Sequence, residues 1–129
     1  MDRTHMTTVA TTSSPSPSGA YSQAIVANGF VYVSGQGPID PATGAHIGSD
    51  IAAQTTATLA NLGAVLEAAG SSLARVVKTT VHLADLADFL EFDAAYNQVF
   101  DVKPPARTTV QSGLPGILVE IDVIALTGD

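Results

Sequence analysis

The sequence predicts an α+β domain in which two helices cover one face of a mixed β-sheet. Three observations support this prediction: an Asn-Gly turn between two apolar runs, two helical stripes of apolar residues, and three further segments that read as strands. In chain order the elements are strand, strand, helix, strand, helix, strand, strand. This order predicts one two-layer domain, because the chain shows neither an internal repeat nor a second set of elements.

The N-terminal segment differs in composition from the rest of the chain. Residues 1–18 are rich in Thr, Ser and Pro, which predicts a flexible segment, and the folded domain is expected over residues 19–129. The pair His5-Met6 is consistent with a tag remnant over residues 1–5 and a natural start at Met6.

A β-hairpin is predicted at the start of the domain. Ala24–Ala27 and Phe30–Ser34 are apolar runs joined by Asn28-Gly29, the residue pair most typical of a two-residue hairpin turn. The next segment, residues 35–48, contains four glycines and two prolines and is therefore predicted to be a loop.

The first predicted helix is amphipathic. Ser49 or Asp50 caps its start, and it runs to Ala69 and ends at Gly70. Its apolar face follows the three-and-four spacing of a buried helix face, at Ile51, Thr55, Leu59, Leu62, Leu66 and Ala69.

An alternating strand and a second helix follow. In Val76–Leu83, one face is expected to carry Val77, Thr79, Val81 and Leu83. Asp85 or Asp88 caps the second helix, and Lys103-Pro104-Pro105 ends it. Its apolar stripe is expected at Phe89, Phe92, Tyr96 and Val99 or Phe100.

Two strands complete the predicted sheet, Ala106–Gln111 and Ile117–Leu126. On the last strand the face expected to meet the helices is wholly apolar, at Val119, Ile121, Val123 and Ala125. The opposite face also carries apolar residues, at Leu118, Ile124 and Leu126, beside two acids. Because such a face is too apolar for water alone, it predicts a partner chain and a homo-oligomer.

Arg107 is one of only five Lys and Arg residues, and it lies in a strand of otherwise small and apolar residues. Burial of an unpaired guanidinium is costly, so Arg107 requires an anionic partner. If the last two strands form a hairpin with residues 112–115 as its loop, Arg107 lies opposite Glu120, and both project from the face away from the helices. The pair then either stabilises the hairpin or forms a site, in which Arg107 binds a ligand carboxylate and Glu120 handles a proton.

The composition argues against several classes of function. The formal net charge of -7 and the scarcity of Lys and Arg argue against nucleic acid. Cysteine is absent, the three histidines lack metal-ligand spacing, and no Gly-x-Ser-x-Gly elbow or His-Asp set accompanies the serines. No apolar run approaches the roughly 20 residues of a membrane span, and no signal-peptide core precedes the domain. We therefore expect a cytoplasmic protein without a metal.

Seven segments, in order, resemble the reactive intermediate deaminase (Rid) family, also called YjgF or endoribonuclease L-PSP. The match spans roughly Gly19 to Leu126, with few gaps. The segments are residues 19–24 (GAYSQA), 33–36 (VSGQ), 38–40 (PID), 67–71 (EAAGS), 76–81 (VVKTTV), 105–107 (PAR) and 119–121 (VEI).

This resemblance implies a chorismate-mutase-like two-layer fold assembled as a homotrimer, with sites in the clefts between subunits. It also implies hydrolysis of reactive enamines and imines, such as 2-aminoacrylate, to 2-keto acids and ammonia without a cofactor. By position, Arg107 matches the arginine that binds the substrate carboxylate, and Glu120 matches the acid associated with the attacking water. The remaining positions implied for the pocket are Tyr21, Ser34, Gly35 and Thr109.

Asp93 is the main departure from the family pattern, because this position often carries Asn in the family. The resemblance places Asp93 near the substrate, where an extra carboxylate can compete for Arg107 and change the substrate range. Two alternatives to the small-imine deaminase stay open. One is a non-catalytic trimeric metabolite-binding or chaperone-like protein. The other is a deaminase of a larger substrate such as 2-aminomuconate, for which Gly37 makes room.

Overall fold

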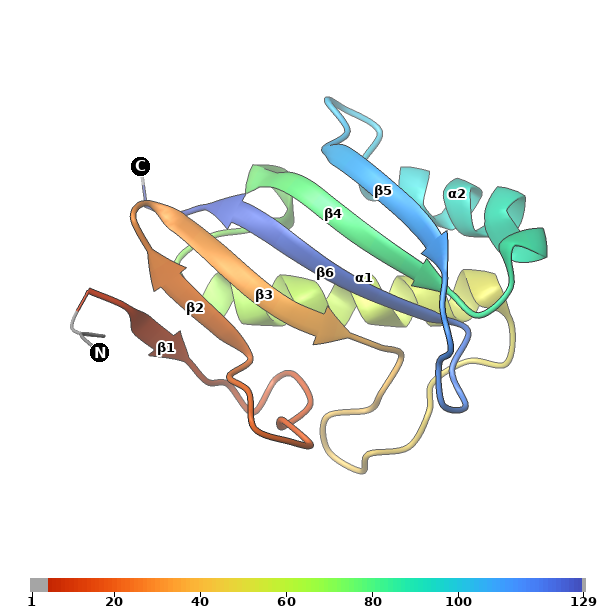
Figure 1. The fold of residues 1–129 in the computed structure, drawn as a ribbon, viewed down its shortest axis with the longest axis horizontal. Coiled ribbons are helices and arrows are strands. Elements are labelled where there is room, and N and C mark those ends of the chain that lie inside the picture. Colours follow the sequence, from red (N-terminus) through yellow and green to blue (C-terminus); the bar gives the residue numbers. More distant parts are fainter. Residues whose placement is uncertain (1–4, 129) are drawn as a thin grey trace.

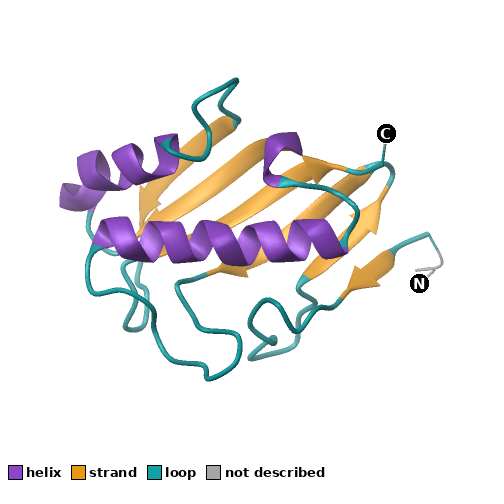
Figure 2. Ribbon diagram, turned by 180° about the vertical axis from the view of Figure 1, so that it is seen from behind, coloured by secondary structure: helices purple, strands orange, loops and turns teal. Residues whose placement is uncertain are grey.

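Residues 5–128, which the computed structural model describes, form two layers: a six-stranded mixed sheet and two α-helices on one of its faces (Figures 1 and 2). The strand order across the sheet is β1-β2-β3-β6-β4-β5. This confirms the predicted α+β architecture. The elements are β1 (Thr7–Val9), β2 (Ala24–Ala27), β3 (Phe30–Gln36), α1 (Ile51–Ala68), β4 (Val76–Leu83), α2 (Phe89–Asn97), β5 (Ala106–Gln111) and β6 (Val119–Leu126), with short 3-10 turns at Leu73–Arg75 and Leu86–Asp88.

Helix α1 supplies the main apolar face of the helical layer. Asp50 caps it by accepting a hydrogen bond from the Ala53 backbone N–H at 2.8 Å, and Gly70 follows its end with a φ of +79°, which favours glycine. The predicted stripe is confirmed, since Leu59, Leu62 and Leu66 are fully buried. They pack with the inward residues of β3, β4 and β6 in one hydrophobic core.

The first hairpin is also confirmed. β2 and β3 are antiparallel neighbours, and Asn28 and Gly29 both adopt positive φ, as a type I′ turn requires. Near its end, β3 carries a bulge against β6 between Val33 and Gln36. Bulges change the direction in which side chains point. The bulge therefore sets Ser34 and Gly35 apart from the regular ladder.

The bulge between Val76 and Lys78 corrects one part of the predicted alternation in β4. It inserts Val77 as an extra residue, so Val77 is exposed while Val76 points into the core. Thr79, Val81 and Leu83 are buried as predicted. Lys78, Thr80 and His82 lie on the other face of the sheet, which no helix covers (Figure 1).

The last two strands do not form the predicted hairpin. β6 lies between β3 and β4 and is antiparallel to both, whereas β5 is the edge strand and runs parallel to β4. β5 has its predicted bounds, and β6 begins at Val119 rather than at the predicted Ile117. The two strands run in opposite directions, but β4 lies between them. The physical reason is that the apolar β6 gains ladder bonds and core packing on both sides when it lies centrally.

The N-terminal segment is more ordered than its composition predicts. β1 pairs with β2, and Ser14 is buried against Gln36. Buried Gln23 satisfies this segment's backbone, because its amide donates to the carbonyls of Thr11 and Pro15. Of the expected tag remnant over residues 1–5, positions 1–4 lie outside the described residues.

Polar residues of α1 fasten the loop that follows β3. The Asn61 side chain is buried and donates to the carbonyls of Gly37 and Ile39, both at 2.9 Å. Gln54 donates to the Gly48 carbonyl and accepts from the Leu118 N–H. These bonds fix the loop at one end of the sheet, next to the start of β6.

Replacement of Asn61 by Ala is expected to lower the free energy of unfolding by about 1–3 kcal/mol, because two loop carbonyls lose their donor. Urea-induced unfolding measures this change, and amide exchange across residues 37–40 should accelerate. Asn97→Ala, at an exposed position of α2, is the matched control and should change stability little. Equal stability of the two variants would refute the role assigned to Asn61.

Candidate functional site

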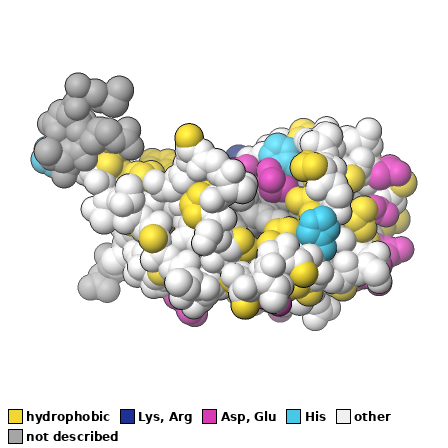
Figure 3. Space-filling model, turned by 90° about the horizontal axis from the view of Figure 1, so that it is seen from below, with side chains coloured by type: hydrophobic (Ala, Val, Ile, Leu, Met, Phe, Trp, Pro, Cys, Tyr) yellow, Lys and Arg dark blue, Asp and Glu magenta, His cyan; other side chains and the backbone are white. Residues whose placement is uncertain are grey.

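One open cavity of about 460 Å³ lies at the loop end of the sheet. Its walls come from the N-terminal segment, the end of β3, the following loop and the start of β6. Three of the predicted site residues, Tyr21, Gly35 and Glu120, line it together. Figure 3 views the molecule from this end, and acidic and histidine side chains gather around a hollow in its surface.

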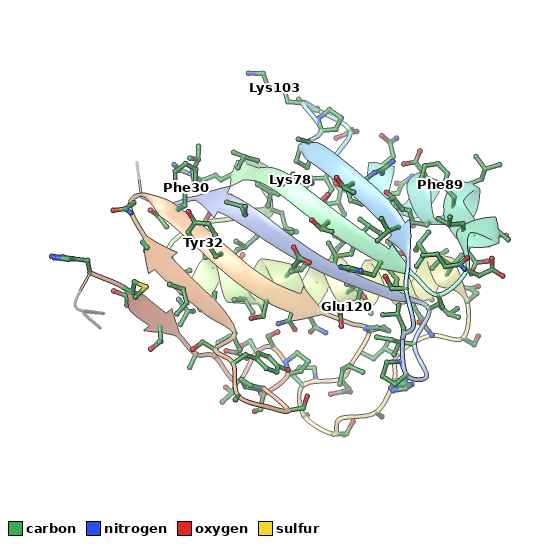
Figure 4. All side chains as sticks on the ribbon, viewed as in Figure 1. Phe30, Tyr32, Lys78, Phe89, Lys103 and Glu120 are labelled. Carbon is green, nitrogen blue, oxygen red and sulfur yellow. The ribbon has the colours of Figure 1, made fainter. Side chains whose placement is uncertain are left out.

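The carboxylate of Glu120 lies directly against Gly35. A Cβ atom on residue 35 would stand 2.8 Å from Glu120 Oε2, closer than real Cβ atoms approach, so Glu120 keeps this position only while residue 35 is glycine. Glu120 projects from the sheet face that no helix covers, where Figure 4 labels it. The lining of the cavity includes a second acid, Asp40, and no Lys or Arg among the described residues. The cavity is therefore acidic.

Tyr21 and Ser34 belong to an adjoining groove that both residues line. The Tyr21 hydroxyl accepts a hydrogen bond from the Ser18 N–H at 3.1 Å, which orients a ring that is 45% exposed. The Ser34 hydroxyl donates to the Ser22 carbonyl at 2.6 Å. This bond uses the hydroxyl proton of Ser34 and holds the chain segment before β2 in place. The hydroxyl oxygen of Ser34 can still accept a hydrogen bond.

Arg107 lies elsewhere, on the helix-covered side of the edge strand β5. Its guanidinium carbon stands 5.4, 5.5 and 4.8 Å from the ring centroids of Phe89, Phe92 and Tyr96. All three rings belong to α2. A guanidinium over aromatic faces gains cation–π attraction and loses little hydrogen bonding, because only its in-plane N–H groups donate. The rings therefore fix the plane of the fork and leave its edge to bind anions.

Asp93 accepts a hydrogen bond from Arg107 Nη1 at 2.7 Å. Asp93 thus contacts Arg107, while its competition with a ligand stays a prediction. The Asp93 side chain is 46% exposed, whereas that of Arg107 is 22% exposed. Both residues line a second cavity of about 360 Å³, together with Tyr96, Asn97, Phe100, Pro104 and Pro105.

Tyr96, which lines this second cavity, forms a buried hydroxyl pair with Thr79. Tyr96 and Thr79 hydroxyls lie 2.8 Å apart, and Thr79 is the residue opposite Arg107 on β4. Burial raises the pKa of Tyr96 above its ordinary value of 10.0, and the Thr79 hydrogen bond and Arg107 oppose that rise. Tyr96 thus stays neutral across the physiological range.

The predicted face-sharing pair of Arg107 and Glu120 is wrong. Arg107 lies opposite Thr79 on the helix-covered face, and Glu120 lies opposite His82 on the open face. Thr109 shares the face of Arg107, opposite buried Val81, but lines neither of the two cavities. In one chain, therefore, Arg107 and Asp93 form one group, and Tyr21, Gly35 and Glu120 form another.

One polar group on the open face was missed from the sequence. His82 Nδ1 lies 2.8 Å from Ser112 Oγ, and His82 Nε2 lies 3.6 Å from Asp122 Oδ2. These residues come from β4, β6 and the segment after β5, so only the correct strand order brings them together. None of the three lines either of the cavities described above. Within residues 5–128 no group of three or more His, Cys, Asp or Glu side chains is arranged to hold a metal ion, and no helix there is long and apolar enough to cross a membrane.

Comparison with known proteins identifies relatives along nearly the whole chain. The family model described as endoribonuclease L-PSP matches residues 11–127. A RutC family protein of Pyrococcus horikoshii is 47% identical over 117 residues, which are 89% of this chain and 93% of the relative. The 2-iminobutanoate/2-iminopropanoate deaminase of Rattus norvegicus is 41% identical over 122 residues, covering 93% of this chain and 89% of the relative. The crystal structure of Escherichia coli TdcF with bound serine superposes with a TM-score of 0.89 at 34% identity, covering 95% of this chain and 99% of that one.

The contact between Gly35 and Glu120 gives a first prediction. Gly35→Ala should displace the Glu120 carboxylate, because the added methyl overlaps it, and should lower the free energy of unfolding by less than about 1 kcal/mol, because the displaced atoms are the end of a flexible side chain. A crystal structure and urea unfolding measure both effects. Gly113→Ala is the matched control, since nothing lies within 4 Å of its added Cβ. An unmoved Glu120 in Gly35→Ala would contradict the assigned contact.

The raised pKa of Tyr96 gives a second prediction. The folded state holds the phenolic proton more tightly than the unfolded state, so its stability is complete below the unfolded pKa of about 10 and is lost as the pH rises above it. Urea unfolding between about pH 8 and pH 11 should show a steeper loss for the native chain than for Tyr96→Phe. Tyr32→Phe, at a half-exposed ring, should keep the native slope. Parallel curves for all three proteins would refute the shift.

Proposed function

The chain belongs to the Rid (YjgF/L-PSP) family, and from this premise we propose that it is an enamine/imine deaminase. It converts small 2-imino acids, such as those formed from 2-aminoacrylate, into 2-keto acids and ammonium. The observation that carries the proposal is Arg107: aromatic rings hold the plane of its guanidinium, and its edge faces a cavity where a ligand carboxylate fits. The relative named as a 2-iminobutanoate/2-iminopropanoate deaminase supports the same chemistry.

The proposed site is completed by a second copy of the chain. Arg107 and Glu120 lie on opposite faces of the sheet, so one chain cannot direct both at the same small ligand. The cavity of Glu120 is acidic and by itself disfavours a carboxylate. If the edge strand β5 of one copy lies against the loop end of the next, Arg107 supplies the missing positive charge. A closed homotrimer with three such sites, as the family resemblance implies, satisfies this requirement.

The residues then divide the reaction between them. Arg107 binds the substrate carboxylate and fixes the imine carbon in place. Glu120 of the neighbouring copy accepts a proton from the attacking water, whose oxygen bonds to the imine carbon. Glu120 then returns this proton to the nitrogen. The C–N bond breaks and ammonia leaves, while the hydroxyl loses its proton to become the keto group; that proton passes to Glu120 or to the ammonia, which leaves as ammonium. No cofactor is needed for these steps, because an iminium carbon is already electrophilic.

The groove lined by Tyr21 and Ser34 adjoins Glu120 and forms the remaining wall. Gly35 presents its backbone there, since the absent side chain leaves room for the Glu120 carboxylate. Thr109 stays a predicted lining residue of the assembled site. The cytoplasmic location expected from the sequence likewise stays a prediction.

A second candidate function is metabolite binding without turnover. The Asp93 carboxylate beside Arg107 favours it, because an extra negative charge at this position departs from the family pattern. Measured binding of an amino acid or keto acid with no ammonium release from an imine would establish this alternative. The third candidate, a deaminase of a larger substrate such as 2-aminomuconate, has less structural support. A Cβ atom on residue 37 would lie 3.0 Å from Ile117 Cδ1, so Ile117 already occupies the space beside Gly37.

Arg107→Lys tests the proposed carboxylate contact. It keeps the charge and removes the fork, so kcat/KM for 2-aminoacrylate hydrolysis should fall at least about tenfold. The substrate is generated by a pyridoxal-phosphate-dependent serine dehydratase, and the loss of the imine is followed directly. Arg75→Lys is the matched control, because Arg75 contacts the Thr127 carbonyl away from both cavities. No acceleration by the native chain, or full activity of Arg107→Lys, would refute the proposal.

Mixing two inactive variants tests whether the site is shared between copies. Arg107→Ala and Glu120→Gln should each be inactive alone, and unfolding and refolding them together in equal amounts should restore roughly a quarter of the sites. Each restored site takes its arginine from one variant and its glutamate from the other. Activity that stays at the level of the separate variants would show that both residues must belong to one chain.

A further inference from the structure

Asp93 is a carboxylate placed beside the arginine that the proposed function assigns to a substrate carboxylate. It lies on α2, facing β5, and accepts one hydrogen bond from Arg107 Nη1 at 2.7 Å. The guanidinium has five N–H donors, and among the described residues only Asp93 accepts a hydrogen bond from it. A ligand carboxylate can therefore bind the remaining edge of the fork while Asp93 stays in place.

The ion pair leaves the cavity with little net charge. The Asp93 side chain is 46% exposed, so solvent screens the pair, and such a pair is easily rearranged when a ligand binds. A simple anion that enters gains Arg107 but meets Asp93 as a neighbouring negative charge. A ligand with a carboxylate and an adjacent cationic nitrogen meets a complementary charge at each end.

The cavity has the size and lining for such a ligand. It measures about 360 Å³, Arg107 and Asp93 stand on adjacent parts of its wall, and Asn97 lies one helical turn beyond Asp93. Its other walls are apolar or aromatic, at Tyr96, Phe100, Pro104 and Pro105. In such surroundings a charged nitrogen is stabilised mainly by the one carboxylate in reach.

We propose that Asp93 makes this site selective for zwitterionic 2-imino and 2-amino acids over 2-keto acids. The ligand carboxylate binds the free edge of Arg107, and the iminium or ammonium nitrogen binds Asp93. This inference rests on the proposed function for the identity of the site, and it adds the charge state of the preferred ligand. Asp93 is thus a specificity-determining residue.

The same arrangement separates substrate from product. A protonated 2-imino acid carries a cationic nitrogen beside its carboxylate, whereas the 2-keto acid formed from it carries a neutral oxygen there. Hydrolysis adds the oxygen of water to the imine carbon and releases that nitrogen as ammonium. The product therefore lacks the cationic nitrogen that binds Asp93, and its carboxylate is still repelled by Asp93. Both differences favour release of the product.

The direct test is a comparison of binding by calorimetry. The probes are L-serine and L-alanine as stable zwitterions and pyruvate as the keto acid. The native protein should bind the zwitterions at least about tenfold more tightly than pyruvate. Asp93→Asn, which keeps the shape and removes the charge, should reverse or abolish this preference by tightening pyruvate and weakening the amino acids. Pyruvate should also inhibit turnover more strongly in Asp93→Asn than in the native chain.

Glu91→Gln is the matched control, because Glu91 is an exposed acid of the same helix outside the cavity and its replacement makes the same change in net charge. It should keep the native preference. Equal affinity of the native protein for all three probes, binding of none of them, or an unchanged preference in Asp93→Asn would overturn the inference. The result is independent of turnover: selective binding without imine hydrolysis would refute the proposed deaminase and retain the role of Asp93.

Discussion

The position of Arg107 determines how the rest of this molecule can work. Three aromatic rings of α2 and the Asp93 carboxylate hold one guanidinium at the edge of the sheet. Such surroundings compensate for removing a permanent charge from water without using all of its donors. The arginine is therefore rigid and still able to bind an anion. Tyr96 connects this group to the core through Thr79, so the fold itself sets the direction of the fork.

The strand order gives this position its functional consequence. Because β6 is central and β5 is an edge, the helix-covered face carries Arg107 and the open face carries Glu120. The bulge in β3 and the glycine at position 35 build the cavity of Glu120 at the opposite side of the sheet. Each chain thus carries two separate groups, the Arg107–Asp93 ion pair on one face and the acidic cavity of Glu120 on the other, and the proposed site requires both. An assembly in which the two groups of different copies meet is the simplest way to complete the site.

Local patterns predicted most of the elements, because caps, turns and apolar periodicity are local properties. The Asn28-Gly29 turn, the Asp50 cap and the buried face of α1 are examples. Register and strand order depend on long-range packing, which local patterns do not report. The short loop before β6 predicted a hairpin, although β6 gains more backbone hydrogen bonds and core contacts by lying between β3 and β4. The same error paired Arg107 with Glu120 and concealed the group of His82, Ser112 and Asp122. Asp93 was correctly expected near Arg107, on the strength of the family resemblance.

The central claim is that Arg107 and Glu120 act on one ligand from two copies of the chain. A crystal structure of the assembled protein with bound L-serine tests this most directly. The account predicts that the ligand carboxylate lies on Arg107 of one copy, its nitrogen lies near Asp93 of that copy, and Glu120 of a neighbouring copy faces it. A ligand held by Arg107 and Glu120 of the same copy, or bound away from Arg107, would contradict the account.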